Sequence, residues 1–309
     1  MKKWHQYPMG PTVQRFLGFQ AAEIPNDSSD QPDDSIRISF QNDLITFLSK
    51  NKTTSDEESL ELLSELVAMG LGEAALYLME NNPVELAKQD FRYLLNIGSA
   101  LMLTDNYPSA LDYFVKAQAE VPEEIATYVN IAAIHYTLQQ DEDVETWAKA
   151  GLRLDHSHQK LWEYLASVYL HENRQTAGAK IKDFALELGS HCGLSLTASM
   201  IAPEDQLYKA ELLSEPFENG SRDETYLIEY SAALGLAKQY EKIPRLLWQL
   251  EQVDGKKPSW QLLTHTAQAY FGLGKESEAK TIISRLEKNP ETPQNIVADL
   301  KATFDQHFS

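Results

Sequence analysis

The sequence repeats a pattern of residue types every 34 residues, and this period constrains the fold more than any other feature. Each of three copies begins with a bulky residue and continues with an apolar residue and a small one: Leu94 with Ile97 and Gly98, Tyr128 with Ile131 and Ala132, and Trp162 with Leu165 and Ala166. A two-helix unit cannot bury its apolar face alone, so successive copies must stack into an elongated array. The period therefore predicts an all-α solenoid of helical hairpins.

The remaining sequence divides around these copies. We predict a flexible N-terminal arm and acidic linker over 1–35, a degenerate helical cap over 36–90, three regular repeats over 91–192, an irregular connecting segment over 193–223, two further repeats over 224–291 and a capping helix over 292–309. Ile36, Ile38 and Phe40 alternate with polar residues and predict a short extended piece at the start of the N-terminal cap. Pro203, Pro216 and Gly220 interrupt the pattern and mark the irregular segment, in which we predict one helix around residues 204–214.

Charge and composition limit the classes of partner. The 309 residues carry a net charge of −19, which argues against nucleic acids and anionic membranes as ligands. The sequence contains no run of 18 apolar residues, so it does not predict a membrane-spanning helix. The first residues have no apolar core of signal-peptide length, and the single cysteine, Cys192, leaves no intramolecular disulfide. We therefore expect a cytoplasmic protein.

Two copies carry a further set of matches. They are Leu94, Ile97, Gly98, Leu101, Ala110, Phe114, Ala117 and Pro122 in the first copy, and Trp162, Leu165, Ala166 and Tyr169 in the third. At these residues the chain resembles the tetratricopeptide repeat family. The resemblance implies a right-handed superhelical solenoid, in which small residues allow close helix approach and bulky ones fill the space between hairpins. The chain departs from the family pattern at Lys182 and His135.

The resemblance also implies a concave groove that is lined by the first helix of each hairpin and binds partners. Carried onto this sequence, the groove residues are Arg92, Leu95, Asn96, Ser99, Met102, Leu103, Val129, Asn130, Tyr136, Lys160, Tyr164, Leu170 and His171. Asn96 and Asn130 stand one period apart. An asparagine amide both donates and accepts, so such a pair can hold the backbone of an extended peptide. The alternative is that each asparagine is solvated or bonded locally.

A second candidate surface lies near the N-terminus. Trp4, Tyr7, Phe16 and Phe19 fall in a basic stretch of an otherwise acidic chain. They form a possible aromatic docking motif, either for the groove of the same chain or for a partner. The alternative is a disordered tail.

The sequence contains none of the common catalytic or cofactor motifs. We find no phosphate-binding glycine loop, no dinucleotide-binding motif, no zinc-protease helix and no nucleophile elbow. His156 and His158 are too few to hold zinc without other ligands, and His191–Cys192 lacks a third orienting group. We therefore expect no catalytic residue, no metal and no cofactor.

These observations favour a non-enzymatic adaptor or scaffold that binds a peptide or helix of a partner protein in its concave groove. One alternative is a chaperone of an exported protein, since the secretion chaperones of the same repeat class resemble the three regular copies. An enzyme with a cryptic site and a self-associating assembly protein are further alternatives.

Overall fold

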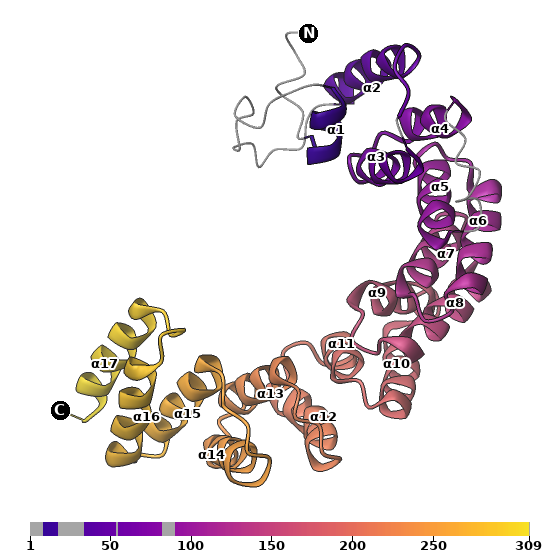
Figure 1. Ribbon diagram of the computed structural model, residues 1–309. Helices are drawn as coiled ribbons and strands as arrows, with labels where there is room; N and C mark the ends of the chain where they lie inside the picture. Colours follow the sequence, from indigo (N-terminus) through magenta and orange to yellow (C-terminus); the bar gives the residue numbers. More distant parts are fainter. Residues whose placement is uncertain (1–8, 18–33, 54, 82–89, 309) are drawn as a thin grey trace. The chain divides into compact units, whose positions relative to one another are not determined.

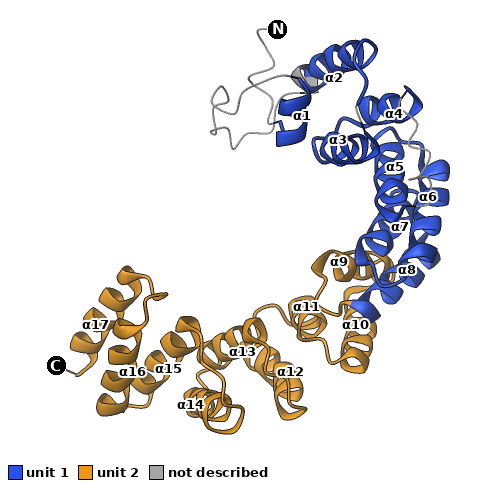
Figure 2. Cartoon of the chain, in the orientation of Figure 1, with its two compact units in different colours: residues 1–154 blue, residues 155–309 orange. Residues whose placement is uncertain are grey.

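The computed structural model describes residues 9–17, 34–53, 55–81 and 90–308, and these residues form 17 α-helices (Figure 1). The described residues contain no β-strand, so the all-α fold class is confirmed. Two compact units divide the chain, residues 1–154 and residues 155–309 (Figure 2). The division falls between the second and third of the predicted regular repeats.

The first unit is a set of helical hairpins preceded by two further helices. Its elements are α1 (Pro11–Phe16), α2 (Asp34–Leu48), α3 (Asp56–Ala68), α4 (Gly72–Asn81), α5 (Phe91–Leu103), α6 (Tyr107–Glu120), α7 (Ile125–Thr137) and α8 (Asp141–Leu154). The pairs α3–α4, α5–α6 and α7–α8 pack as hairpins, and α3, α5 and α7 follow one another as first helices. Helices α5 and α7 begin 34 residues apart, as do α6 and α8, so the sequence period is a structural period here.

The small and bulky positions of the repeat explain how a hairpin closes. A Cβ atom at Gly98 of α5 would lie 2.7 Å from the ring of Phe114 on α6, which is closer than carbon atoms pack. Phe114 is fully buried, so its ring has no free space into which to move. In the next hairpin the ring of Tyr128 lies 5.9 Å from that of Trp147, and its hydroxyl donates to the carbonyl of Pro122.

The second unit continues with hairpins. Its helices are α9 (Gln159–Tyr169), α10 (Arg174–Leu188), α11 (His191–Ile201), α12 (Gln206–Glu218), α13 (Glu224–Leu236), α14 (Ile243–Trp248), α15 (Trp260–Gly272), α16 (Glu276–Lys288) and α17 (Gln294–Phe308). A 3₁₀ turn over Tyr240–Lys242 precedes α14, and a π-helical turn over Gln249–Val253 follows it. Helix α17 packs on α15 and α16, with Phe304 and Phe308 against Phe271.

The segment expected to be irregular, 193–223, contains most of α11 and all of α12. Helix α12 overlaps the one helix expected there, around residues 204–214, whereas α11 was not expected. These helices pack against each other as a hairpin. The side chains of Ser190 and Asp205 cap them by accepting from the backbone N–H groups of Gly193 and Tyr208. Pro203 falls between the two helices, and Pro216 lies in the last turn of α12, where it removes the bond that its N–H group would make to the carbonyl of Leu212 just before the helix ends at Glu218. The prolines therefore end helices here without preventing them.

The segment expected to be a flexible arm also contains a helix. Residues Pro11–Phe16 form α1, which packs against α3. The segment expected to be extended, from Ile36 to Phe40, lies within α2.

Candidate partner-binding site

The first-helix surface of the first unit carries the groove residues predicted on α5 and α7. We call this surface, made by Leu95, Asn96, Ser99, Met102, Leu103, Val129, Asn130 and Tyr136, the α5–α7 face. None of these side chains is fully buried, and those of Leu103 and Tyr136 are 43% and 45% exposed. Leu95 and Met102 also pack partly against the core. The face is therefore apolar and open to a ligand at its Leu103 and Tyr136 positions.

The two asparagines of the α5–α7 face differ in their bonding. The Nδ2 group of Asn96 donates to the backbone carbonyl of Arg92, 2.8 Å away in the same helix. This is the local bonding that was the alternative to peptide binding for Asn96. Asn130 is half-buried, and no side-chain hydrogen bond joins it to the described residues. Its amide therefore keeps both its donors and its acceptor for a ligand.

Arg92 is held at one end of this face by carboxylates. Its guanidinium lies 2.9 Å from Glu57 at the start of α3 and 3.2 Å from Asp90, the N-cap of α5. The hydrogen bonds to Glu57 and then to Asp90 raise the pKa of Arg92 further above its ordinary value. Both carboxylates also lie at helix N-termini, where negative charge is favourable. Arg92 thus joins the N-termini of α3 and α5 in addition to its predicted role as a groove residue.

The groove residues predicted from the third copy belong to the second unit. On α9, the Lys160 ammonium lies 3.1 Å from the Glu163 carboxylate and 5.1 Å from the centroid of the Tyr164 ring. Leu170 and His171 follow the C-terminus of α9 and are exposed. The predicted groove is therefore divided between the two units, and the α5–α7 face is the larger of its parts within one unit.

Of the four residues of the predicted aromatic motif, the structure describes Phe16 alone. Trp4, Tyr7 and Phe19 lie outside the described residues. Phe16, the last residue of α1, stacks edge-on against Phe47 of α2, with ring centroids 5.5 Å apart. The structure therefore places Phe16 against α2 and not on the α5–α7 face.

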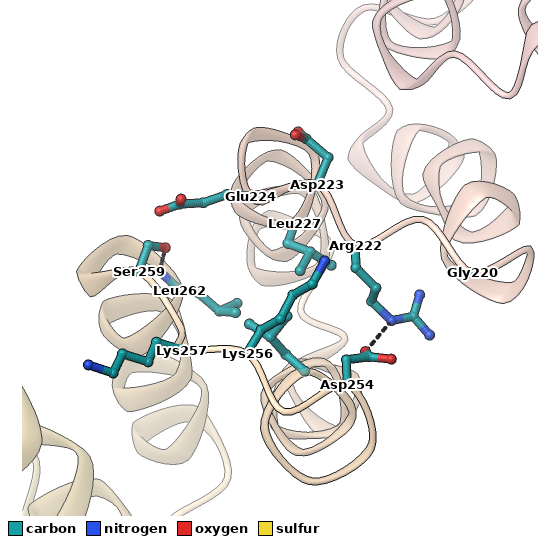
Figure 3. Close-up of a pocket in the computed structure, with 11 residues that line it drawn as sticks. Gly220, Arg222, Asp223, Glu224, Leu227, Asp254, Lys256, Lys257, Ser259 and Leu262 are labelled. Atoms are coloured by element: carbon teal, nitrogen blue, oxygen red, sulfur yellow. Dashed lines mark hydrogen bonds and ion pairs between the residues drawn. The ribbon is translucent and has the colours of Figure 1, made fainter.

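A cavity of about 650 Å³ in the second unit had no counterpart in the sequence reasoning (Figure 3). Leu227, Leu250 and Leu262 form its apolar part. Its charged lining residues are Arg222, Lys256, Lys257, Asp223, Glu224 and Asp254, so basic and acidic groups are equal in number. The Arg222 guanidinium lies 2.8 Å from Asp254, and Lys256 and Lys257 point in different directions from one loop. This balance gives the cavity no preference for an ion of either sign.

The side chains that suggested chemistry are not activated. Burial lowers the pKa of the His191 imidazole and raises the pKa of the Cys192 thiol, so burial favours the uncharged form of both groups. Nucleophilic cysteines need the opposite shift. Within the described residues no group of three His, Cys, Asp or Glu side chains could hold a metal ion. None of the described helices combines the length and the apolar character that crossing a bilayer requires.

Comparison with known proteins finds similarity only among solved structures. No protein-family model matches the sequence, and no curated protein matches it. A tetratricopeptide repeat protein from Parabacteroides merdae aligns over 82% of this chain and 99% of its own, with 16% identity and a TM-score of 0.37. Pseudomonas aeruginosa PilF aligns over 69% of this chain and 97% of its own, with 10% identity and a TM-score of 0.36. Yeast Tom70 aligns over 89% of this chain and 59% of its own, with 13% identity and a TM-score of 0.39. Because these values are low, the proposals below rest on the chain's own residues and geometry.

Proposed function

We propose that this chain is a non-enzymatic adaptor or scaffold, and that the α5–α7 face binds a peptide or helix of a partner protein. The observation that carries the proposal is the combination of exposed apolar side chains at Leu103 and Tyr136 with the unbonded amide of Asn130. Apolar side chains that gather on one face commonly mark an interaction site. An amide among them supplies the directional bonds that fix a ligand's register.

The chemistry of the face defines the ligand. Tyr136 offers a large amphipathic side chain, the type most often found at the energetic centres of protein interfaces. The Asn130 amide can pair with one N–H and one C=O group of a peptide backbone. A ligand with an apolar side chain beside an accessible backbone amide satisfies both. The net charge of −19 adds a preference for basic partners, and we expect no nucleic acid or membrane ligand and a cytoplasmic location.

Peptide selection tests the proposal without a known partner. Peptides selected on the wild-type chain from a random phage-displayed library are synthesised, and their affinities are measured by fluorescence anisotropy. We expect Tyr136→Ala to weaken binding about 30-fold, as for loss of about 2 kcal/mol at an interface centre. Asn130→Ala should weaken binding about fivefold, as for one neutral hydrogen bond.

A matched control comes from the second helix of a hairpin. Val115 on α6 is also an exposed apolar side chain, and Val115→Ala should leave the affinity unchanged. All three variants should melt within a few degrees of wild type, because none of these residues is buried. Equal affinities for all three variants, or a selection that returns no binding peptide, would refute the proposal.

The chaperone alternative uses the same face but a different ligand. A chaperone holds an unfolded, aggregation-prone segment, whereas an adaptor binds a defined peptide or helix. A chaperone would therefore accept many unrelated apolar peptides with similar affinities. A narrow consensus among the selected peptides favours the adaptor.

A further inference from the structure

Helix α1 is attached to α3 through its backbone. The N–H groups of Thr12 and Val13 donate to the two carboxylate oxygens of Glu65 on α3, at 2.8 and 2.7 Å. The N-cap of α1, Gly10, has no side chain with which to cap the helix, and Pro11 has no N–H group to bond. Glu65 therefore supplies from another helix the capping oxygens that a local side chain usually provides.

The side chains of the same segment complete the attachment. Val13 is fully buried and Met9 is 7% exposed, although both lie in a segment that the sequence assigned to a flexible arm. Arg15 lies 3.0 Å from Glu61, one turn of α3 before Glu65. Phe16 packs edge-on against Phe47 of α2. Residues 9–17 are thus held by the carboxylates of Glu61 and Glu65, by the burial of Met9 and Val13, and by the ring of Phe47.

Helix α1 has the physical character of a bound ligand. Its six residues are too few to form a stable helix alone in water, so its helical form depends on the surface that holds it. Among the helices it packs on α3, with Phe16 reaching α2 (Figure 1). Its helical form therefore depends on the side chains of α2 and α3 that it contacts.

We infer that the α2–α3 surface around Glu65 is a docking site for a short helix, that residues 9–17 occupy it within the chain, and that a partner segment of the same chemistry displaces them. The site selects a helix that begins with Gly-Pro and carries a β-branched residue three positions after the glycine, as at Val13. It also selects a basic residue two positions later, as at Arg15. Glycine is favoured at the start because a Cβ atom at Gly10 would lie 2.5 Å from a Glu65 carboxylate oxygen and would push the carboxylate away from the N–H groups of Thr12 and Val13.

The test uses full-length chains and a fluorescein-labelled peptide of residues 9–17. In the wild type the chain's own segment competes at the high effective concentration of an attached ligand. In Gly10→Val that segment no longer fits, which leaves the site open. We expect the peptide to bind Gly10→Val at least tenfold more tightly than wild type in fluorescence anisotropy.

Two further variants in the Gly10→Val background identify the site. Glu65→Gln should weaken peptide binding at least tenfold, because it removes the charge that the two N–H donors face. Glu80→Gln, which removes an exposed carboxylate on α4, should leave binding unchanged. Equal binding to wild type and Gly10→Val, absence of binding to both, or equal effects of the two glutamine variants would each overturn the inference. Variants of the α5–α7 face are not involved, so this result and the proposed function are tested separately.

Discussion

Two histidines of the second unit should make its stability fall in mild acid. His265 on α15 lies with Nδ1 2.7 Å from the Ser231 hydroxyl of α13. That hydroxyl gives its own proton to the carbonyl of Ile228, so it accepts from the imidazole, which must carry its proton on Nδ1. His191 on α11 is buried with its ring 5.3 Å from that of Tyr226. Both rings are therefore packed against α13.

The direction and size of the effect follow from proton linkage. Burial lowers the pKa of both His191 and His265, so the unfolded chain binds more protons than the folded chain near and below pH 6.5. Their contribution to stability is therefore complete above the unfolded pKa and is lost as the pH falls toward the folded values. A histidine that stays neutral in the folded state loses about 1.4 kcal/mol between pH 7.5 and 5.5. The two histidines together can therefore lower the free energy of unfolding by at most about 2.7 kcal/mol over this range. Glu229 and Asp223 make the contribution of His191 smaller, because they favour its charged form.

Substituting both histidines isolates their contribution to the pH dependence of stability from that of the other titrating residues. His265→Asn keeps an N–H donor near the position of Nδ1 but does not titrate, and His191→Gln removes the second group. The free energy of unfolding is measured by urea titration and circular dichroism at pH 7.5 and pH 5.5. We expect the wild type to lose about 1 to 2.7 kcal/mol more than the double variant, while His171→Asn, an exposed control, behaves as wild type. An equal loss in wild type and double variant would refute the reasoning.

Two pairs of substitutions test the packing of the hairpins. Tyr226→Phe should cost about 1–3 kcal/mol because the buried hydroxyl donates to the carbonyl of Leu213, whereas Tyr230→Phe on the same helix should change the free energy of unfolding by less than about 0.5 kcal/mol. Gly98→Val should destabilise the first unit by about 1–3 kcal/mol through overpacking against Phe114, and Phe114→Leu should relieve part of that cost in the double variant. Urea titrations measure the free energies of unfolding in both cases. If the effects of Gly98→Val and Phe114→Leu simply add, the close contact between these two positions is contradicted.

The regular hairpins were predictable because their signal is local and repeated. The small residue Gly98 recurs as Ala132 and Ala166, the bulky residue Leu94 recurs as Tyr128 and Trp162, and the helices of the first unit follow the same period. The extended piece predicted from Ile36 to Phe40 was wrong because a period of two was read over too few residues. Phe40, Leu44 and Leu48 are all buried at a spacing of four, which is the helical signal that decides this segment.

The candidate site was predictable only where side-chain direction follows from helix position. The exposure of Tyr136 and the placement of Asn130 on α7 follow from the repeat. The docking of α1 does not, because its two decisive hydrogen bonds join residues 52 and 53 positions apart and use the backbone, which carries no sequence signal. Likewise, Glu57 reaches Arg92 across 35 positions.

Polar contacts between residues 34 positions apart continue through the region in which the apolar pattern is weak. The Ser190 hydroxyl donates to the carbonyl of His156, Ser231 bonds to His265, and Glu251 pairs with Arg285, each across 34 positions. Ser195 and Glu229 make a fourth contact at the same separation. The helices at these contacts begin 32 to 36 residues apart, so each contact joins neighbouring hairpins at similar positions. Serine, histidine and glutamate at these places do not read as a repeat of apolar residues, which explains why α11 was not predicted and why only one helix, around residues 204–214, was expected in this segment.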